Sequence, residues 1–122
     1  MRLTYMLIMK LPKTEKIKIG RLGIIKFNRG HYIYVGSAPS YKGYYTPRIE
    51  RHFRKKKKLF WHIDYFLKKS KIIDVKYSCL SECKTAQKLF KKYESIKGFG
   101  CSDCSCRSHL FYVRRLSSKT WN

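Results

Sequence analysis

Acidic residues are scarce in this sequence. It has 7 Asp and Glu against 29 Lys and Arg, a net charge of +22 over 122 residues. Such charge opposes compaction by self-repulsion, and a polyanionic partner would cancel it. Nucleic acid is therefore the expected partner. An anionic membrane surface and a generally basic proteome are weaker explanations, and no basic amphipathic helix with a broad apolar face supports the first of these.

Long apolar runs are also missing. No stretch approaches the roughly 20 apolar residues of a membrane span, and no small-residue cleavage site follows the short apolar run near the N-terminus. We therefore expect a cytoplasmic protein without a membrane partner. Its five cysteines, an odd number, are expected to be reduced thiols or metal ligands and not disulfides.

Neither an internal repeat nor a linker divides the chain, so we predict one domain over residues 1–116 and a flexible C-terminal tail over 117–122. Hydrophobic periodicity predicts elements in the order β-β-β-α-α-β-α-β. Their ranges are 3–11, 17–27, 31–36, 47–55, 60–69, 71–79, 82–93 and 109–115. This order indicates the α+β class, with a central, mostly antiparallel sheet flanked by about three helices.

Turn and capping residues mark several boundaries of these elements. Two glycines within 17–27 indicate a bulge or bend, and the Asn-Arg-Gly turn after it predicts a hairpin to the strand 31–36. Thr46 and Ser81 suit the N-cap positions of the helices that follow them.

The strand 31–36 places two tyrosines on one face. Ile33 and Val35 alternate with Tyr32 and Tyr34, so the phenols share the face opposite the aliphatic residues. Packing against a helix is the commoner role of strand tyrosines. Alternatively, nearby positive charge would lower the pKa of a phenol from about 10 towards neutrality. Such a phenol can accept a proton or position a water molecule.

The helix 47–55 carries two basic stripes. Arg48 and His52 lie four residues apart in its first turns, where the helix dipole also attracts anions, so we expect them to contact phosphate. Arginine binds phosphate with two parallel hydrogen bonds, and histidine can move a proton near neutral pH. Arg51 and Lys55 form the second stripe, which we interpret chiefly as a solvated basic face.

The helix 82–93 has a carboxylate on its apolar face. Glu82 lies four residues before Ala86, which shares that face with Leu89 and Tyr93. The helix dipole explains an acid in the first turn, but it does not explain why this acid faces inward. One Mg²⁺ ion often needs only one or two carboxylates besides water and substrate phosphate, so Glu82 is a candidate metal ligand.

A cluster of soft ligands precedes the last strand, in the segment "CSDCSCRSH". It comprises Cys101, Cys104, Cys106 and His109. Four such ligands within nine residues suggest zinc, and Cys83 can replace Cys101 from the preceding helix. The alternatives are quietly buried thiols and a role of Asp103 and His109 near the phosphate site. In "WHIDY", Asp64 is expected in a structural ion pair.

The segments "YVGSA" and "RIERHF" resemble the signature of the GIY-YIG nuclease superfamily. In that family two tyrosine motifs lie on neighbouring strands, a helix with an arginine follows, and a later helix supplies one metal-binding glutamate. The second motif matches Tyr34-Val35-Gly36. The first is matched by Leu3-Thr4-Tyr5, in which Leu3 replaces the usual glycine. "FWHIDYFL" and "FGCSDCSCRSHLFYV" extend the match, over residues 1–113, to an uncharacterised and mainly archaeal branch.

The resemblance implies roles for individual residues. Tyr5 and Tyr34 take the places of the two motif tyrosines, and Glu82 that of the glutamate that binds Mg²⁺ or Mn²⁺. The helix arginine matches Arg48, and histidines found in some members match His52 and His62. Tyr34, with His52 or Tyr5, would take a proton from the attacking water, and Arg48 would stabilise the transition state.

The resemblance therefore implies a metal-dependent endonuclease that hydrolyses phosphodiester bonds, in DNA more readily than in RNA, with repair or recombination as the expected setting. A basic group would grip the backbone: Arg51, Lys55, Lys56, Lys57 and Lys58. The alternative is a non-catalytic nucleic-acid-binding protein on the same fold. Leu3 in the first motif and the absence of a separate targeting module in so small a chain favour it.

Overall fold

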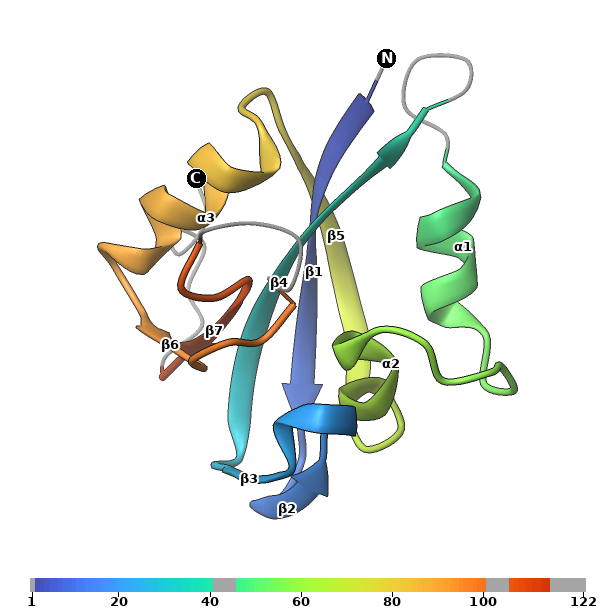
Figure 1. Ribbon diagram of the computed structural model, residues 1–122, viewed down its shortest axis with the longest axis vertical. Helices are drawn as coiled ribbons and strands as arrows, with labels where there is room; N and C mark the ends of the chain where they lie inside the picture. The colour runs from blue at the N-terminus through green and yellow to red at the C-terminus, as the bar shows by residue number, and fades with distance from the viewer. Residues whose placement is uncertain (1, 41–45, 101–105, 115–122) are drawn as a thin grey trace.

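The computed structural model describes residues 2–40, 46–100 and 106–114 (Figure 1). The main strands are β1 (Arg2–Leu11), β4 (Gly30–Pro39), β5 (Lys71–Ser78), β6 (Glu94–Ser95) and β7 (Leu110–Val113). The helices are α1 (Pro47–Phe53), α2 (His62–Leu67) and α3 (Glu82–Phe90). The strands form one sheet in the order β5-β1-β4-β7-β6, with every neighbouring pair antiparallel. The predicted α+β arrangement is confirmed.

The two central strands divide the core between the two faces of the sheet. Tyr32 and Tyr34 of β4 belong to one buried cluster and Ile33 and Val35 to another, as their alternation predicts. The tyrosine face is covered by α2, with Ile49 of α1 packed at its margin. The aliphatic face is covered by α3. Figure 1 shows α3 on one side of the sheet and α1 and α2 on the other.

The segment 17–27 differs from its prediction as one strand of the central sheet. It contains part of β2 (Glu15–Lys18), a 3₁₀ turn (Gly20–Leu22) and β3 (Ile24–Phe27), and the two strands pair with each other as a separate sheet. The φ angles of Gly20 and Gly23 are +46° and +83°, left-handed values that end a strand. The predicted hairpin between 17–27 and 31–36 is therefore wrong, because β4 pairs with β1.

Other boundaries also differ. The strand predicted over 31–36 runs on to Pro39, and all three helices are shorter than predicted. Strand β6 lies between the predicted elements 82–93 and 109–115, where the sequence predicts no strand. The ammonium of Lys57 explains the early end of α1, since it donates to the carbonyls of Arg51 and His52 at 3.2 and 2.8 Å. These bonds satisfy carbonyls that the helix end leaves without a partner.

Both predicted N-caps are confirmed. The hydroxyl of Thr46 accepts from the amide of Arg48 at 3.3 Å, and that of Ser81 accepts from the amide of Lys84 at 3.2 Å. The predicted C-terminal tail over 117–122 lies outside the described residues. Among the described helices, none is long and apolar enough to cross a bilayer.

A buried carboxylate ties α1 to the start of α2. Asp64 is fully buried, and the guanidinium of Arg51 donates to its two oxygens at 2.9 and 3.0 Å. The amides of Phe60 and Trp61 each donate to Oδ2 at 2.9 Å. Burial raises the pKa of Asp64, but these hydrogen bonds outweigh burial and hold it below its ordinary value. The expected structural ion pair is present.

Replacing this carboxylate should destabilise the protein in a pH-dependent way. Asp64→Asn leaves Arg51 partly buried without its counter-charge, so we expect a loss of about 3 kcal/mol at neutral pH. The pKa of Asp64 is lower in the folded than in the unfolded state. Its stabilisation is therefore complete above the unfolded value of about 4 and is lost as the pH falls through the folded value.

Urea unfolding over a pH series measures this difference between wild type and Asp64→Asn, with Asp74→Asn as the control because the Asp74 side chain is 46% exposed. A wild-type advantage that stays constant from neutral to strongly acid pH would contradict the assigned role.

Candidate active site

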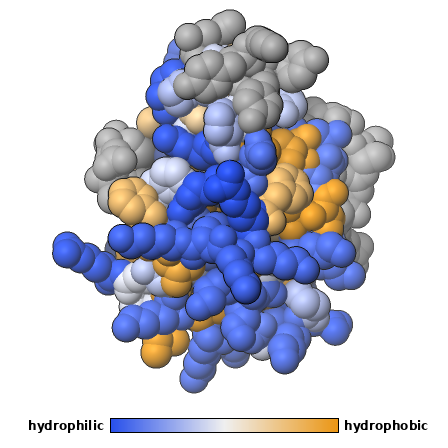
Figure 2. Space-filling model, turned by 90° about the vertical axis from the view of Figure 1, so that its right-hand side faces the viewer, coloured by the Kyte–Doolittle hydropathy of each residue, from blue (hydrophilic) through white to orange (hydrophobic). Residues whose placement is uncertain are grey.

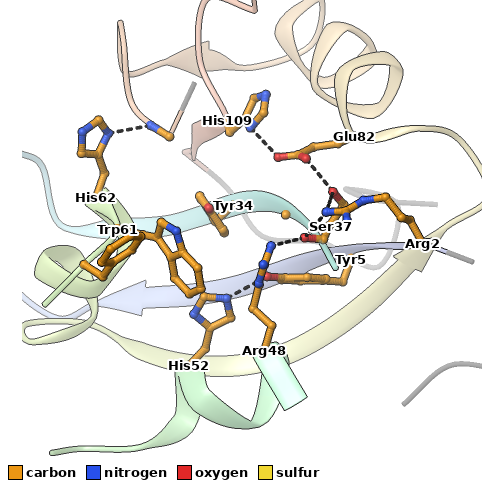
Figure 3. A pocket seen from close by; sticks show the side chains of 13 residues that line it. Arg2, Tyr5, Tyr34, Ser37, Arg48, His52, Trp61, His62, Glu82 and His109 are labelled. Carbon is orange, nitrogen blue, oxygen red and sulfur yellow. Dashed lines mark hydrogen bonds and ion pairs between the residues drawn. The ribbon is translucent and has the colours of Figure 1, made fainter. Parts of the chain in front are cut away.

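A cleft of about 510 Å³ opens beside the ends of β1 and β4 (Figure 3). All six residues assigned to catalysis or to Mg²⁺ binding from the sequence line it: Tyr5, Tyr34, Arg48, His52, His62 and Glu82. Glu82 and His109 lie on one side and Arg48 and His52 on the other, with Tyr34 between them. The structure therefore brings these residues together from three helices and two strands.

The position of Tyr5 depends on a glycine in the neighbouring strand. Tyr5 pairs with Gly36 in the register of β1 and β4. A Cβ atom on Gly36 would lie 2.6 Å from both Cζ and the hydroxyl oxygen of Tyr5, closer than real atoms approach. The absence of a side chain at Gly36 lets the ring of Tyr5 lie against β4. Its hydroxyl is then 2.8 Å from Nε2 of His52.

His52 is buried and neutral. Burial, together with the nearby charge of Lys57, lowers the pKa of His52 to about 3. Its Nε2 contacts Tyr5, and Nδ1 has no hydrogen-bond partner among the described residues. At physiological pH the ring is thus a neutral partner of the phenol, and not the cation that would attract phosphate by charge.

The two tyrosines stay protonated. Burial raises the pKa of Tyr5, with the neighbouring Tyr34 adding to the rise. Burial and the charge of Glu82 likewise raise the pKa of Tyr34. Arg48 acts in the opposite direction on both but is outweighed. The predicted lowering of a tyrosine pKa towards neutrality is therefore wrong, because the sequence does not reveal how deeply the rings are buried.

Glu82 is anchored at the start of α3 by two neighbouring side chains. The hydroxyl of Ser37 donates to Oε1 at 2.6 Å, and Nδ1 of His109 lies 3.0 Å from Oε2. Burial raises the pKa of Glu82, but these two contacts and the charge of Arg2 outweigh it and keep the pKa below its ordinary value. The cleft thus holds a charged carboxylate that is 31% exposed.

Two guanidinium groups converge next to this carboxylate. Arg48 donates to the carbonyl of Ser37, and Arg2 donates to the same carbonyl and to the Ser37 hydroxyl, both at 3.2 Å. Each guanidinium has five N–H donors, so these bonds use only part of its capacity. The cleft therefore combines one carboxylate with two cations that can bind the oxygens of an anionic ligand.

His62 takes a defined tautomer at the edge of the cleft. Its Nδ1 accepts a hydrogen bond from the amide of Gly100 at 2.9 Å. Burial lowers the pKa of His62, which favours the neutral ring. Since Nδ1 is an acceptor, the proton of the neutral ring is on Nε2, which can act as a donor.

The residues predicted to bind a nucleic-acid backbone differ in their exposure and in the hydrogen bonds that they already make. Arg51 is bonded to Asp64 and to the carbonyl of Lys58, and Lys57 turns back onto α1. Lys55, Lys56 and Lys58 are exposed. On the side of the molecule where α1 and α2 lie, hydrophilic side chains cover most of the surface (Figure 2).

Part of the predicted cysteine cluster lies next to the cleft. Cys83, Cys106 and His109 each offer one ligand atom, and these atoms lie within 4.8 Å of one another, so the three residues can hold a metal ion. Cys101, Asp103 and Cys104 lie outside the described residues. His109 also contacts Glu82, which agrees with the alternative that places it near the phosphate site.

Sequence reasoning missed several residues of the site. Arg2 reaches Ser37 only because of the strand register, for which the sequence has no local signal. Ser37 directly follows the Tyr-Val-Gly motif, and its hydroxyl could have been proposed as a partner of Glu82. Phe60, which also lines the cleft, precedes the "WHIDY" segment and carries no polar signal.

A family model for a domain of unknown function, DUF123, matches residues 4–121. The chain belongs to the DUF123 family. None of the curated proteins and none of the solved structures matches it. The DUF123 match covers every residue that lines the cleft except Arg2. Since the family description assigns no function, the chemistry has to be inferred from the geometry of the cleft.

A methyl group at Gly36 should disrupt this cleft of the DUF123 domain. Gly36→Ala forces the Tyr5 ring away from β4, and we expect a loss of about 1–3 kcal/mol in the free energy of unfolding. Chemical denaturation measures this loss. In a Tyr5→Ala background the same substitution should cost little, because its steric partner is gone. An equal loss of unfolding free energy in both backgrounds would show that the contact with Tyr5 is not the reason why position 36 requires glycine.

Proposed function

We propose that this DUF123 protein is a metal-dependent endonuclease of the GIY-YIG type, which hydrolyses phosphodiester bonds in DNA more readily than in RNA. The observation that carries the proposal is the composition of the cleft. A charged carboxylate, Glu82, and two guanidinium groups, those of Arg2 and Arg48, meet around Ser37 in a cleft that also holds a buried phenol–imidazole pair. Together with a net charge of +22, this arrangement suits a phosphodiester substrate.

The residues around Glu82 fit a hard divalent cation. The ligands available are the carboxylate oxygens of Glu82 and the hydroxyl oxygen of Ser37, and Mg²⁺ and Mn²⁺ prefer oxygen ligands. Each carboxylate oxygen has two lone-pair sites, so the contacts with Ser37 and His109 leave one site on each. A bound metal ion would neutralise the scissile phosphate and assist the leaving 3′ oxygen.

The protein side chains would bind the substrate and move the proton. Arg48 and Arg2 bind phosphate oxygens and stabilise the charge of the transition state. Tyr34 orients the attacking water through its phenol. The water proton passes to the Tyr5 oxygen while the Tyr5 proton moves to Nε2 of His52. Burial keeps the pKa of His52 low, so the imidazolium formed in this step readily loses its proton again.

Loss of the Glu82 carboxylate or of the Arg48 guanidinium should abolish most of the DNA cleavage. For Glu82→Ala and Arg48→Ala we expect the cleavage rate to fall by about 10²- to 10⁴-fold, because each removes one stabilising group of the transition state. The assay uses supercoiled, nicked and branched DNA with Mg²⁺, Mn²⁺ or a chelator. Glu94→Ala is the matched control, since Glu94 is exposed on β6 and does not line the cleft. Undiminished cutting by Glu82→Ala would exclude the metal role.

A specific observation favours the second candidate, a non-catalytic nucleic-acid-binding protein. Both oxygens of Glu82 already have protein partners, and both arginines donate to Ser37. The cleft can thus be a rigid binding surface. In that case binding persists in a chelator and no strand is cut. Log affinity for duplex DNA still falls with log salt, at a slope of about −0.9 for each phosphate neutralised.

We further propose that Cys83, Cys106 and His109 bind Zn²⁺. Thiolates and imidazole are the ligands zinc prefers. A zinc-bound histidine commonly donates its other N–H to a carboxylate, and Glu82 is placed for that contact. The zinc site would then hold His109, and through it Glu82, in position.

Removing a zinc ligand should remove the metal. Cys83→Ser and Cys106→Ser should lose the one zinc per chain expected of the wild type and should unfold at a lower temperature. Cys79→Ser is the control, because Cys79 is exposed and is not part of the cluster. Elemental analysis and thermal unfolding with and without a chelator measure both effects. A wild type that carries no zinc and is indifferent to the chelator contradicts the proposal.

A further inference from the structure

An exposed aromatic ring stands at the mouth of the cleft. Phe60 is 74% exposed and lines the cleft. The other large apolar side chains that are exposed among the described residues, such as Phe53 and Phe90, do not line it. A single exposed phenylalanine is ordinary on a protein surface, so its position beside the cationic cleft is the informative feature.

The backbone that carries Phe60 is fixed. Its amide and that of Trp61 donate to the buried carboxylate of Asp64 at 2.9 Å, and Arg51 holds that carboxylate from the other side. The ring is therefore presented from an anchored backbone. A binding group that is already held in place loses less conformational entropy when a ligand binds.

Trp61 supports the ring of Phe60 from the side. The two ring centroids are 5.5 Å apart and nearly perpendicular, at 88°. Trp61 in turn lies against the guanidinium groups of Arg48 and Arg51, at 4.7 and 4.4 Å from its centroid. These cation–π contacts occupy the Trp61 ring, whereas most of the Phe60 ring remains exposed to solvent.

The surroundings of Phe60 favour a nucleobase over another occupant. A lone phenyl group among arginine and lysine side chains is not the continuous apolar patch that a protein or lipid partner needs. Hydrophilic side chains dominate this side of the molecule (Figure 2). A nucleotide matches both features, since its base offers a flat face to an aromatic ring and its phosphate offers charge to the arginines.

We propose that Phe60 stacks on an unpaired nucleobase next to the phosphate bound in the cleft. The inference rests on the proposed function, because it takes the ligand of the cleft to be a nucleic acid. It names the substrate class: single strands, flaps, gaps and branch points, in which a base is free to leave the stack. In a continuous duplex the bases are paired and stacked, and exposing one costs free energy.

The test compares three polymers of the same length: a single DNA strand, the same strand with abasic sites throughout, and the paired duplex. The abasic strand keeps the phosphates and lacks the bases. Fluorescence anisotropy without added Mg²⁺ or Mn²⁺ measures binding without cleavage. Phe60→Ala should weaken binding of the base-bearing strand by about 5- to 100-fold. It should leave the affinities for the abasic strand and the duplex nearly unchanged.

Matched variants separate stacking from other effects. Phe60→Trp should retain the affinity, and Phe60→Leu, which keeps apolar bulk without a π face, should lose it. Phe90→Ala removes another exposed ring, on α3 and outside the cleft, and should change nothing. Circular dichroism and thermal unfolding confirm that each variant is folded, as expected for a side chain that is 74% exposed.

Two outcomes would overturn the stacking role of Phe60 but not the proposed function. In the first, Phe60→Ala binds the single strand as tightly as wild type. In the second, Phe60→Ala binds all three polymers more weakly by the same factor. A wild type that binds none of the polymers would overturn the proposed function as well. A result that excludes base stacking on Phe60 is therefore distinguishable from a result that excludes the proposed nuclease function.

Discussion

The antiparallel pairing of β1 with β4 is the constraint on which the candidate site depends. It sets Tyr5 against Gly36, a position where any side chain would collide with the phenol. The next residue of β4, Ser37, then provides the carbonyl that accepts from Arg2 and Arg48 and the hydroxyl that donates to Glu82. A slip of one residue would turn these side chains to the opposite face of the sheet. The register of β1 and β4 therefore determines the geometry of the site.

Two carboxylates in a chain of net charge +22 have different environments, which suit them to different roles. Asp64 is fully buried and surrounded by donors from Arg51 and the backbone, so its charge holds α1 and α2 together. Glu82 is only partly buried and faces a cleft. A charged oxygen that a ligand can reach is available for chemistry, whereas an enclosed one serves structure. The proposed reaction thus depends on Glu82, whereas the proposed base stacking on Phe60 depends on Asp64, which anchors its backbone.

Part of the site could be predicted from local patterns in the sequence, whereas Tyr5 and His62 are candidates only because of the resemblance to the GIY-YIG superfamily. Strand alternation separates Tyr34 from Val35, capping residues mark the starts of α1 and α3, and helical spacing turns Glu82 inward. The rest depends on tertiary structure. Gly20 and Gly23 signal a bend, but they do not say that β2 and β3 pair with each other. The pKa values of Tyr5 and Tyr34 follow from burial, which outweighs the nearby arginine charge.

Metal binding at Glu82, next to Arg48, is the central claim, and paramagnetic NMR tests it most directly. The labelled protein is titrated with Mn²⁺ in the presence of a non-cleavable phosphorothioate DNA strand. The account predicts that the amide signals of Ser37 and Glu82 broaden at substoichiometric Mn²⁺, while those of Ile24, on the separate β2–β3 sheet, stay sharp. Unchanged signals at Ser37 and Glu82, or uniform broadening over the whole protein, would contradict it.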